Sequence, residues 1–218
     1  MSISVQMDAH EARLFGVLIE KALTTPDQYP LSLNAATNGA NQKSNRDPVL
    51  VLTEDDVAEA LYRLEQKYLV RKVFSRVERY RHNGKETLGL EYPELAVLAE
   101  LLMRGPQMPG ELRTRASRMS PIDSQEQLLA LLSKLIERGM VQRLDPTPGA
   151  RAERYVQLLS PSLHPLDAPA APETSGSSSS AAPGLAARID TLEGELARLR
   201  QRFEGMMTKL GISLDEVE

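Results

Sequence analysis

Cysteine and tryptophan are absent from this chain of 218 residues, and aromatic side chains make up only 4% of it. The lack of cysteine excludes disulfides, thiolate nucleophiles and cysteine-ligated zinc, and it fits a reducing cytoplasm. Because aromatic residues are so few, any core must consist mostly of Leu, Val, Ile and Met. With 41% apolar and 26% charged residues, the overall balance is that of a globular protein.

Signals for a membrane, a metal or a catalytic centre are also missing. No window approaches 18 apolar residues, and the first residues, MSISVQMDAH, lack the basic and apolar segments of a signal peptide. The three histidines (His10, His82 and His164) are scattered, and no glycine-rich phosphate loop is present. We therefore expect a cytoplasmic protein that is not an enzyme and has no cofactor or metal.

The net charge of −4 comes entirely from the C-terminal part of the chain. Residues 1–160 contain 21 Lys and Arg against 21 Asp and Glu, whereas residues 161–218 contain 5 against 9. The overall acidity therefore says little about what residues 1–160 bind.

The C-terminal part divides into a linker, a helix and a short tail. Residues 161–184 are dominated by Pro, Ala, Ser and Gly, which predicts a disordered linker. Residues 185–211 follow a heptad pattern whose flanking charges favour a parallel homodimer, although a single amphipathic helix docked on the body fits too. Residues 212–218 form an acidic tail. The predicted dimer seam consists of Leu185, Ile189, Leu192, Leu196, Leu199, Phe203, Met206 and Leu210.

An internal repeat organises residues 1–160. The segment TEDDVAEALYRLEQKYLVRKV, from Thr53, aligns without gaps with SQEQLLALLSKLIERGMVQRL, from Ser124. Each copy reads as a helix that runs into a strand, and Thr53 and Ser124 are good N-cap residues. A turn and a second strand should follow, with turns at 82–85 in the first copy and 146–149 in the second.

Two more apolar-periodic segments precede each copy, at 11–23 and 32–42 and again at 93–105 and 110–119. Three helices followed by a hairpin are the layout of a winged-helix domain, although other αβ domains could give the same pattern. The fold class predicted is mainly α with small β-hairpins (α+β). Two tandem winged-helix domains, 1–90 and 91–160, would be followed by the C-terminal coiled-coil helix.

Basic residues gather around the first predicted hairpin, with a net charge of +6 over residues 63–85. A basic hairpin can lie along a phosphate backbone, but Lys and Arg on a hairpin can also simply prevent edge pairing. We expect contacts with DNA phosphates from Arg71, Lys72, Arg76, Arg79, Arg81 and Lys85, and a smaller second set from Arg113, Arg115 and Arg118.

The stretch ANQKSNRDPV (40–49) lies before the third helix and has no equivalent in the repeat. It is either an ordinary turn or a polar surface in which Lys43, Asn45 and Arg46 add contacts. The helix that follows begins with carboxylates, including Glu54 and Asp55, which phosphates would repel. DNA contact is therefore expected from the hairpin and the loop, mostly without sequence readout.

The segments LIEKALTTPDQYPLSLNAATNGANQKSNRDPV and LLMRGPQMPGELRTRASRM resemble the YceH-like family of uncharacterised bacterial proteins. The resemblance covers roughly residues 9–160 and implies tandem winged helices, but it supplies no catalytic residues. The expected function is that of a dimeric, transcription- or chromosome-associated protein that binds double-stranded DNA. The alternative is a protein-binding scaffold, like the kleisin-binding winged-helix subunits of bacterial condensin.

Overall fold

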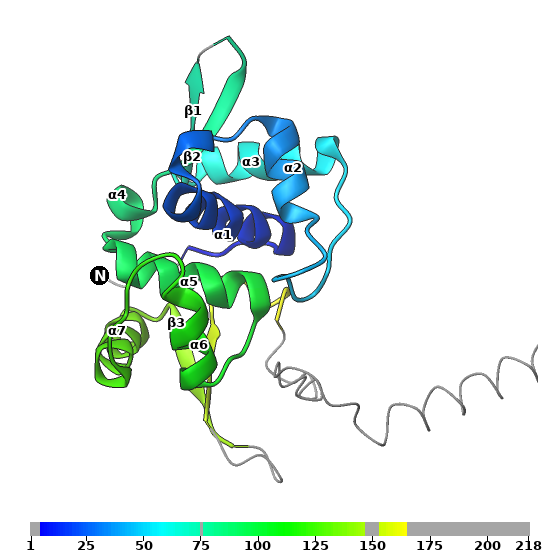
Figure 1. The fold of residues 1–218 in the computed structure, drawn as a ribbon. Helices are drawn as coiled ribbons and strands as arrows, with labels where there is room; N and C mark the ends of the chain where they lie inside the picture. Colours follow the sequence, from blue (N-terminus) through cyan, green and yellow to red (C-terminus); the bar gives the residue numbers. More distant parts are fainter. Residues whose placement is uncertain (1–4, 75, 147–152, 165–218) are drawn as a thin grey trace, which may run out of the picture. The chain divides into compact units, whose positions relative to one another are not determined.

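The computed structural model describes residues 5–74, 76–146 and 153–164. Within them the chain is a mixed α/β protein with seven α-helices, one short 3₁₀ helix and two antiparallel two-stranded hairpins (Figure 1). The predicted coiled-coil residues 185–211 and the acidic tail lie outside the described residues. Residues 161–164, the first four of the predicted linker, form a turn in which Leu163 and His164 are buried, and the rest of that segment lies outside the described residues.

The first half contains three main helices, as predicted. Two of them begin with reciprocal capping boxes, in which Asp8 pairs with Glu11 and Thr53 pairs with Asp56. The prediction that Thr53 caps the third helix is therefore confirmed. The elements are α1 (Ala9–Thr24), the 3₁₀ helix η1 (Pro26–Gln28), α2 (Leu33–Ala40) and α3 (Glu54–Gln66).

The second half repeats this order after a short additional helix, α4 (Gly84–Leu88). Its third helix starts at Ser124, whose side chain accepts a hydrogen bond from the backbone N–H of Gln127, as the repeat predicts. The helices are α5 (Tyr92–Arg104), α6 (Pro109–Ala116) and α7 (Gln125–Glu137).

The two hairpins are β1–β2 (Val70–Phe74 and Glu78–His82) and β3–β4 (Val141–Leu144 and Arg154–Gln157). In the first hairpin Val70 pairs with His82 and Phe74 pairs with Glu78. The turn expected at 82–85 is therefore wrong: the chain reverses between Phe74 and Glu78. Asn83 and Gly84, which suggested a turn, instead lead into α4.

Helices α1 and α5 pack against each other at the centre, and the buried residues of both halves form one hydrophobic cluster. Gly16 on α1 lies at this contact. A Cβ atom there would be 2.8 Å from Met103 Cγ and 3.4 Å from the Ala99 carbonyl oxygen, so glycine allows the two helices to approach closely. The two halves consequently share a core.

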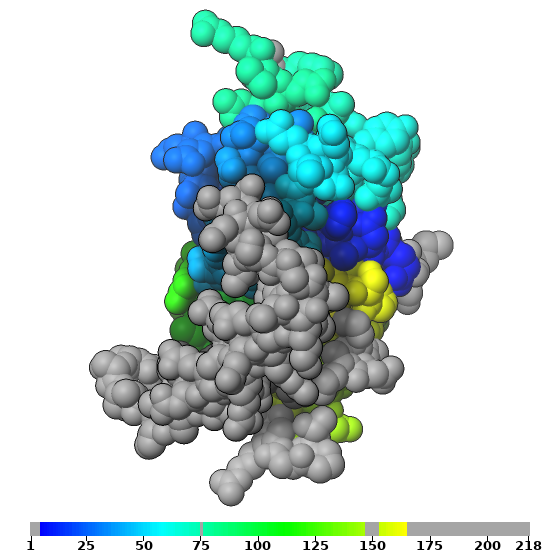
Figure 2. Space-filling view, turned by 90° about the vertical axis from the view of Figure 1, so that its right-hand side faces the viewer, coloured from blue at the N-terminus to red at the C-terminus, as the bar shows by residue number. Residues whose placement is uncertain are grey.

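The hairpins lie at opposite ends of this unit. Figure 1 shows β1–β2 extending beyond α1 and α3, and β3–β4 beside α5 and α7 at the other end. Figure 2 shows the tip of β1–β2 standing clear of the surface below it. The two hairpins therefore do not form one continuous surface.

Candidate nucleic-acid interface

The first hairpin, β1–β2, has two different faces. The register places Arg71 directly opposite Arg81, and Val73 opposite Arg79, so three guanidinium groups share one face. The other face carries Val70, Tyr80 and His82 at its base, all of them buried against the helices. The cationic face is thus opposite to the face that packs against the helices.

The arginines of this hairpin differ in how much intramolecular pairing they have. Arg71 and Arg76 are exposed and form no ion pair with any described residue. Arg79 is half-buried and donates a 2.8 Å hydrogen bond to the carbonyl oxygen of Pro30. Arg81 lies 3.8 Å from Glu86, and Lys72 lies 3.6 Å from Glu78. Arg71 and Arg76 are therefore the cations best placed for an external anion.

Three other basic residues near the hairpin in the sequence form ion pairs within the protein. Lys67 holds the buried carboxylate of Glu11 at 2.7 Å, and Arg63 lies 3.8 Å from the same group. Lys85 is not part of the hairpin, because it lies in α4, where it pairs with Glu91 at 2.7 Å and stacks over the Tyr92 ring. Lys85 is therefore not part of the hairpin's cationic face, and the phosphate contact predicted for it would come from α4.

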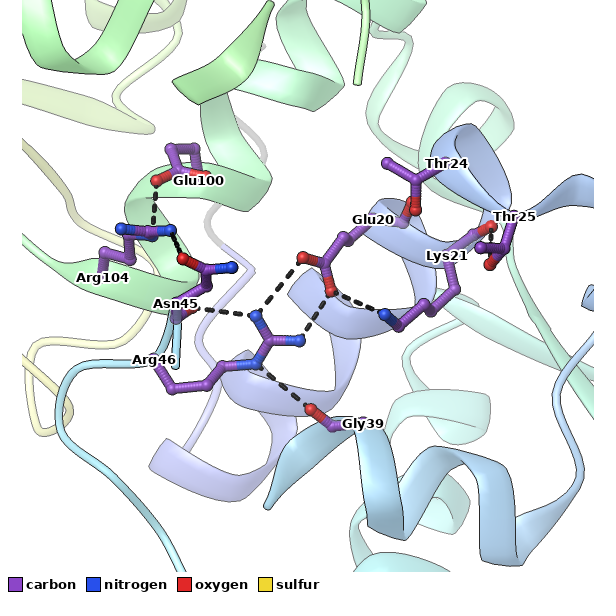
Figure 3. Close-up of polar contacts among 9 residues, drawn as sticks. All are labelled: Glu20, Lys21, Thr24, Thr25, Gly39, Asn45, Arg46, Glu100 and Arg104. Carbon is purple, nitrogen blue, oxygen red and sulfur yellow. Dashed lines mark hydrogen bonds and ion pairs between the residues drawn. The ribbon is translucent and has the colours of Figure 1, made fainter. Parts of the chain in front are cut away.

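The loop 40–49 is bound mainly to the protein. Arg46, expected as a surface contact, is buried, and its guanidinium forms a bidentate pair with Glu20 through contacts of 2.6 and 3.4 Å (Figure 3). It also donates to the carbonyl oxygens of Gly39 (3.2 Å) and Asn45 (2.8 Å). This burial makes Arg46 a structural residue, which corrects its assignment as an external contact.

Asn45 and its neighbour Asp47 connect the loop to α5. Arg104 donates a hydrogen bond to the Asn45 side chain and pairs with Glu100 at 2.8 Å (Figure 3). The backbone N–H of Asp47 donates to the carbonyl oxygen of Met103 at 2.8 Å. The loop therefore joins the first half to the second, and Asn45 has an internal partner although it is exposed.

Two buried cationic or basic side chains complete this junction, and sequence reasoning missed both. Arg13, fully buried on α1, donates to the carbonyl oxygen of Pro48 at 2.6 Å, and burial together with the charge of Arg46 lowers its pKa to about 10. His164 Nε2 lies 2.7 Å from the carbonyl oxygen of Asp47, and burial lowers the histidine pKa. The one available sequence signal was the position of Arg13 within the otherwise apolar run ARLFGVLI (12–19) of α1.

Lys43 is the one predicted loop contact that is exposed and has no hydrogen bond or ion pair to a described residue. Farther along, Glu54 and Asp55 at the start of α3 are also exposed. Carboxylates at this position suit the positive helix end and would repel a phosphate backbone. The start of α3 is therefore a poor surface for DNA.

The second basic set lies on or just after α6, at the other end of the unit from β1–β2 (Figure 1). Arg115 donates to the side chain of Gln107 at 2.7 Å and lies 3.5 Å from Glu111. Arg113 makes 3.5 Å contacts with the carbonyl oxygens of Ile122 and Asp123, whereas Arg118 is exposed. The structure does not bring this set together with the first hairpin.

Within the described residues, neither a metal-ligand group nor a membrane-spanning helix is found. No group of three or more His, Asp or Glu side chains in that part of the chain could hold a metal ion. No described helix is both long enough and apolar enough to cross a membrane.

Comparison with known proteins shows one family. Residues 7–150 match the family described as "Protein of unknown function, DUF480". The chain is 44% identical to a UPF0502 protein of Hahella chejuensis over 210 residues, which covers 92% of this chain and 94% of the relative. It is 51% identical to a UPF0502 protein of Geotalea daltonii over 160 residues, covering 72% and 73%.

A UPF0502 protein of Mesorhizobium japonicum is 45% identical over 199 residues, covering 90% of this chain and 94% of the relative. A match to 90% of the chain is longer than residues 9–160 alone can supply. The similarity therefore continues beyond the stretch to which the sequence motifs had limited it.

Proposed function

We propose that this chain, which belongs to the bacterial family of DUF480 and UPF0502 proteins, is a non-catalytic protein that binds double-stranded DNA through its first hairpin. The family is consistent with the YceH-like resemblance of the sequence motifs. The observation that carries the proposal is the cationic face of β1–β2, where Arg71, Arg79 and Arg81 lie together and Arg76 follows at the tip.

The fold supports this proposal through the position of the hairpin. We interpret each half, with three helices followed by a hairpin, as a winged-helix domain, in which β1–β2 is the first wing. The third helix of such a domain commonly enters the major groove, but α3 begins with exposed Glu54 and Asp55. The wing is therefore the element suited to DNA here, and it would contact phosphates with little sequence readout.

The number of phosphates that the hairpin neutralises determines how strongly DNA affinity should depend on salt. Each phosphate that a cation neutralises releases counterions, and it adds about 0.9 to the slope of log affinity against log salt. Arg71 and Arg76 could each neutralise one phosphate, and Lys72, Arg79 and Arg81 would add to this if their internal contacts loosen. Binding should therefore be strong at low salt and weaken steeply as salt is raised.

The test is binding of the purified full-length chain to a labelled random duplex over a range of salt. A variant with Arg71, Lys72, Arg76, Arg79 and Arg81 changed to Ala is measured beside the wild type. We expect micromolar or tighter binding by the wild type and a weaker, shallower salt dependence for the variant. Absence of wild-type binding even at low salt would overturn the proposal.

The predicted coiled coil would place two first hairpins in one assembly. If residues 185–211 form a parallel dimer, the second hairpin would bind at a raised effective concentration. A variant truncated after residue 164 should then bind DNA more weakly than the full chain while keeping the same salt slope per hairpin, as measured by the same titration.

A protein-binding scaffold remains the second candidate, because the second half has a groove of about 640 Å³. Met108, Pro109 and Pro146 give it apolar walls, and Glu111 and Arg143 lie at its edge. Such a groove could hold an extended peptide. If the wild type fails to bind DNA, charge changes at Glu111 and Arg143 become the next variants for a search for protein partners.

A further inference from the structure

Phe74 is an apolar side chain in an unusual place. It ends strand β1 at the tip of the first hairpin and is 78% exposed, although the whole chain has only three phenylalanines. Strand alternation puts it on the same face as Val70, which is buried at the hairpin base. Lys72 lies between them on that face and pairs at 3.6 Å with Glu78, the residue opposite Phe74. Phe74 is therefore an exposed aromatic ring at the tip, beyond the buried base of the hairpin.

The surroundings of Phe74 carry a net positive charge, although the residue opposite it in the register is Glu78. Arg76 follows it in the turn and is exposed, and Val77, beside it, is 60% exposed. Arg71 and Arg81 lie two residue pairs farther from the tip than Val73 and Arg79, and all four are on the opposite face of the hairpin from Phe74. The hairpin tip that carries Phe74 and Arg76 is therefore exposed, and Figure 2 shows the end of β1–β2 projecting from the protein.

We propose that Phe74 is a wedge that enters the minor groove and partly separates two stacked base pairs, while the arginines behind it hold the flanking phosphates. Minor-groove proteins combine an apolar wedge with cations in this way and kink the duplex by roughly 20–90°. The net positive charge of the hairpin favours a polyanion over an apolar protein surface, because docking of the tip on the latter would bury Arg76 without a partner. This inference rests on the proposed DNA binding and adds how the duplex is engaged.

Two consequences distinguish a wedge from a phosphate contact. The duplex should bend, and it should bend most readily at a pyrimidine–purine step such as TA, which unstacks at low cost. Removing the ring should abolish the bend but leave the salt dependence intact, because Phe74 neutralises no phosphate. Removing the arginines should instead make the dependence of affinity on salt shallower.

The experiment uses the full-length chain and a duplex of about 30 base pairs with one central TA step. Fluorophores at its two ends report bending by energy transfer, and 2-aminopurine in place of the adenine reports unstacking by increased fluorescence. The test variant is Phe74→Ala. The matched control is Val51→Ala, which also shortens an exposed apolar side chain, since Val51 is 90% exposed in the loop before α3.

We expect the wild type and Val51→Ala to bend the duplex and to raise 2-aminopurine fluorescence. Phe74→Ala should lose both signals and bind on the order of tenfold more weakly, with an unchanged salt slope. If the wild type binds with a steep salt slope but neither bends nor unstacks the duplex, or if Phe74→Ala behaves like the wild type, the wedge is wrong and the phosphate contact stands. If the wild type does not bind at any salt concentration, the DNA-binding proposal fails and the wedge fails with it.

Discussion

The two hairpins occupy corresponding places in the two halves, yet they carry different charge. Residues 70–82 contain five Lys and Arg against one Glu, whereas residues 141–157 contain three against two. In the second hairpin Arg143 lies 3.8 Å from Asp145 and 3.5 Å from Glu153, so its charge is largely matched within the hairpin. The two halves thus share an architecture, but the net positive charge is larger in the first hairpin than in the second.

The loops that precede the two third helices differ in length and in the residues that they contact. Residues 41–53 join α2 to α3 and reach across to α5 and His164, whereas the shorter segment 117–124 joins α6 to α7. The longer loop joins the two halves through Asn45 and Asp47, and Arg46 anchors this loop to Glu20 on α1. The loop thus contributes internal cohesion, whereas the first hairpin is the element for which we propose external binding.

The largest effect should come from breaking that internal junction. Arg46→Ala leaves the Glu20 carboxylate, which is only 15% exposed, without its bidentate partner. Losing one member of a buried ion pair costs about 3–5 kcal/mol of unfolding free energy, as measured by chemical denaturation. Lys43→Ala, in the exposed part of the same loop, is the control and should change stability by less than about 0.5 kcal/mol. Equal stabilities of the two variants would show that the junction contributes little.

The base of the first hairpin should make stability depend on pH. His82 packs near Phe15 and Tyr29, and burial, helped by the charge of Arg81, lowers its pKa from 6.5 to about 4. Below pH 6.5 the unfolded chain takes up a proton that the folded chain does not, so stability falls as the pH drops and levels off near pH 4. Between pH 6.5 and 5 the loss from this group should be about 2 kcal/mol.

His82→Asn keeps an acceptor near the Gly84 N–H but removes the titrating ring, so it should flatten the fall in stability over this pH range. The same exchange at His164, whose pKa is lowered in the same direction, should also flatten it. The readout is the slope of unfolding free energy against pH, which is insensitive to a constant loss of packing. An unchanged slope in His82→Asn would contradict the assignment of a neutral, buried histidine.

The two third helices allow a direct comparison of their caps. Thr53 shares a reciprocal capping box with Asp56, whereas Ser124 accepts a single backbone hydrogen bond from Gln127. Thr53→Ala should therefore cost about 1 kcal/mol or more, and Ser124→Ala a smaller amount within the range of about 0.5–2 kcal/mol known for caps. Thermal and chemical unfolding measure both losses, and a larger loss at Ser124 would reverse the expected order.

The smallest effect should come from giving the second hairpin the charge of the first. Asp145→Asn with Glu153→Gln removes the carboxylates beside Arg143 and raises the net charge of the second hairpin. DNA affinity at low salt should rise by about two- to fivefold, since only one cation becomes free to neutralise a phosphate. A gain as large as the loss caused by the first-hairpin variant would show that charge alone, irrespective of position, determines binding.

Local chemistry made much of the fold predictable from the sequence. The apolar spacing gave the helices, and Thr53 and Ser124 marked two helix starts, because an N-cap acts on residues only three positions away. The turn of the first hairpin was misplaced, since Asn83 and Gly84 carry a strong turn signal whereas the actual reversal after Phe74 contains neither glycine nor proline in residues 75–77.

The junction could not be predicted in the same way. Arg46 reads as a solvated loop residue, because its partner Glu20 lies 26 positions away and only the folded chain brings the two together. Arg13 likewise meets Pro48 across 35 positions. The cationic hairpin could be anticipated because charge density is local, whereas the identity of its exposed members depends on the register.

The most direct test of the difference between the hairpins is the salt dependence of DNA binding by two matched double variants of the full-length chain. One carries Arg71→Ala and Arg76→Ala, and the other carries Arg143→Ala and Arg154→Ala in the second hairpin. If the first hairpin holds the phosphates, the first variant should lose about 2 from the slope of log affinity against log salt, and the second should keep the wild-type slope. Equal slopes for the two variants would contradict the assignment of DNA binding to the first hairpin.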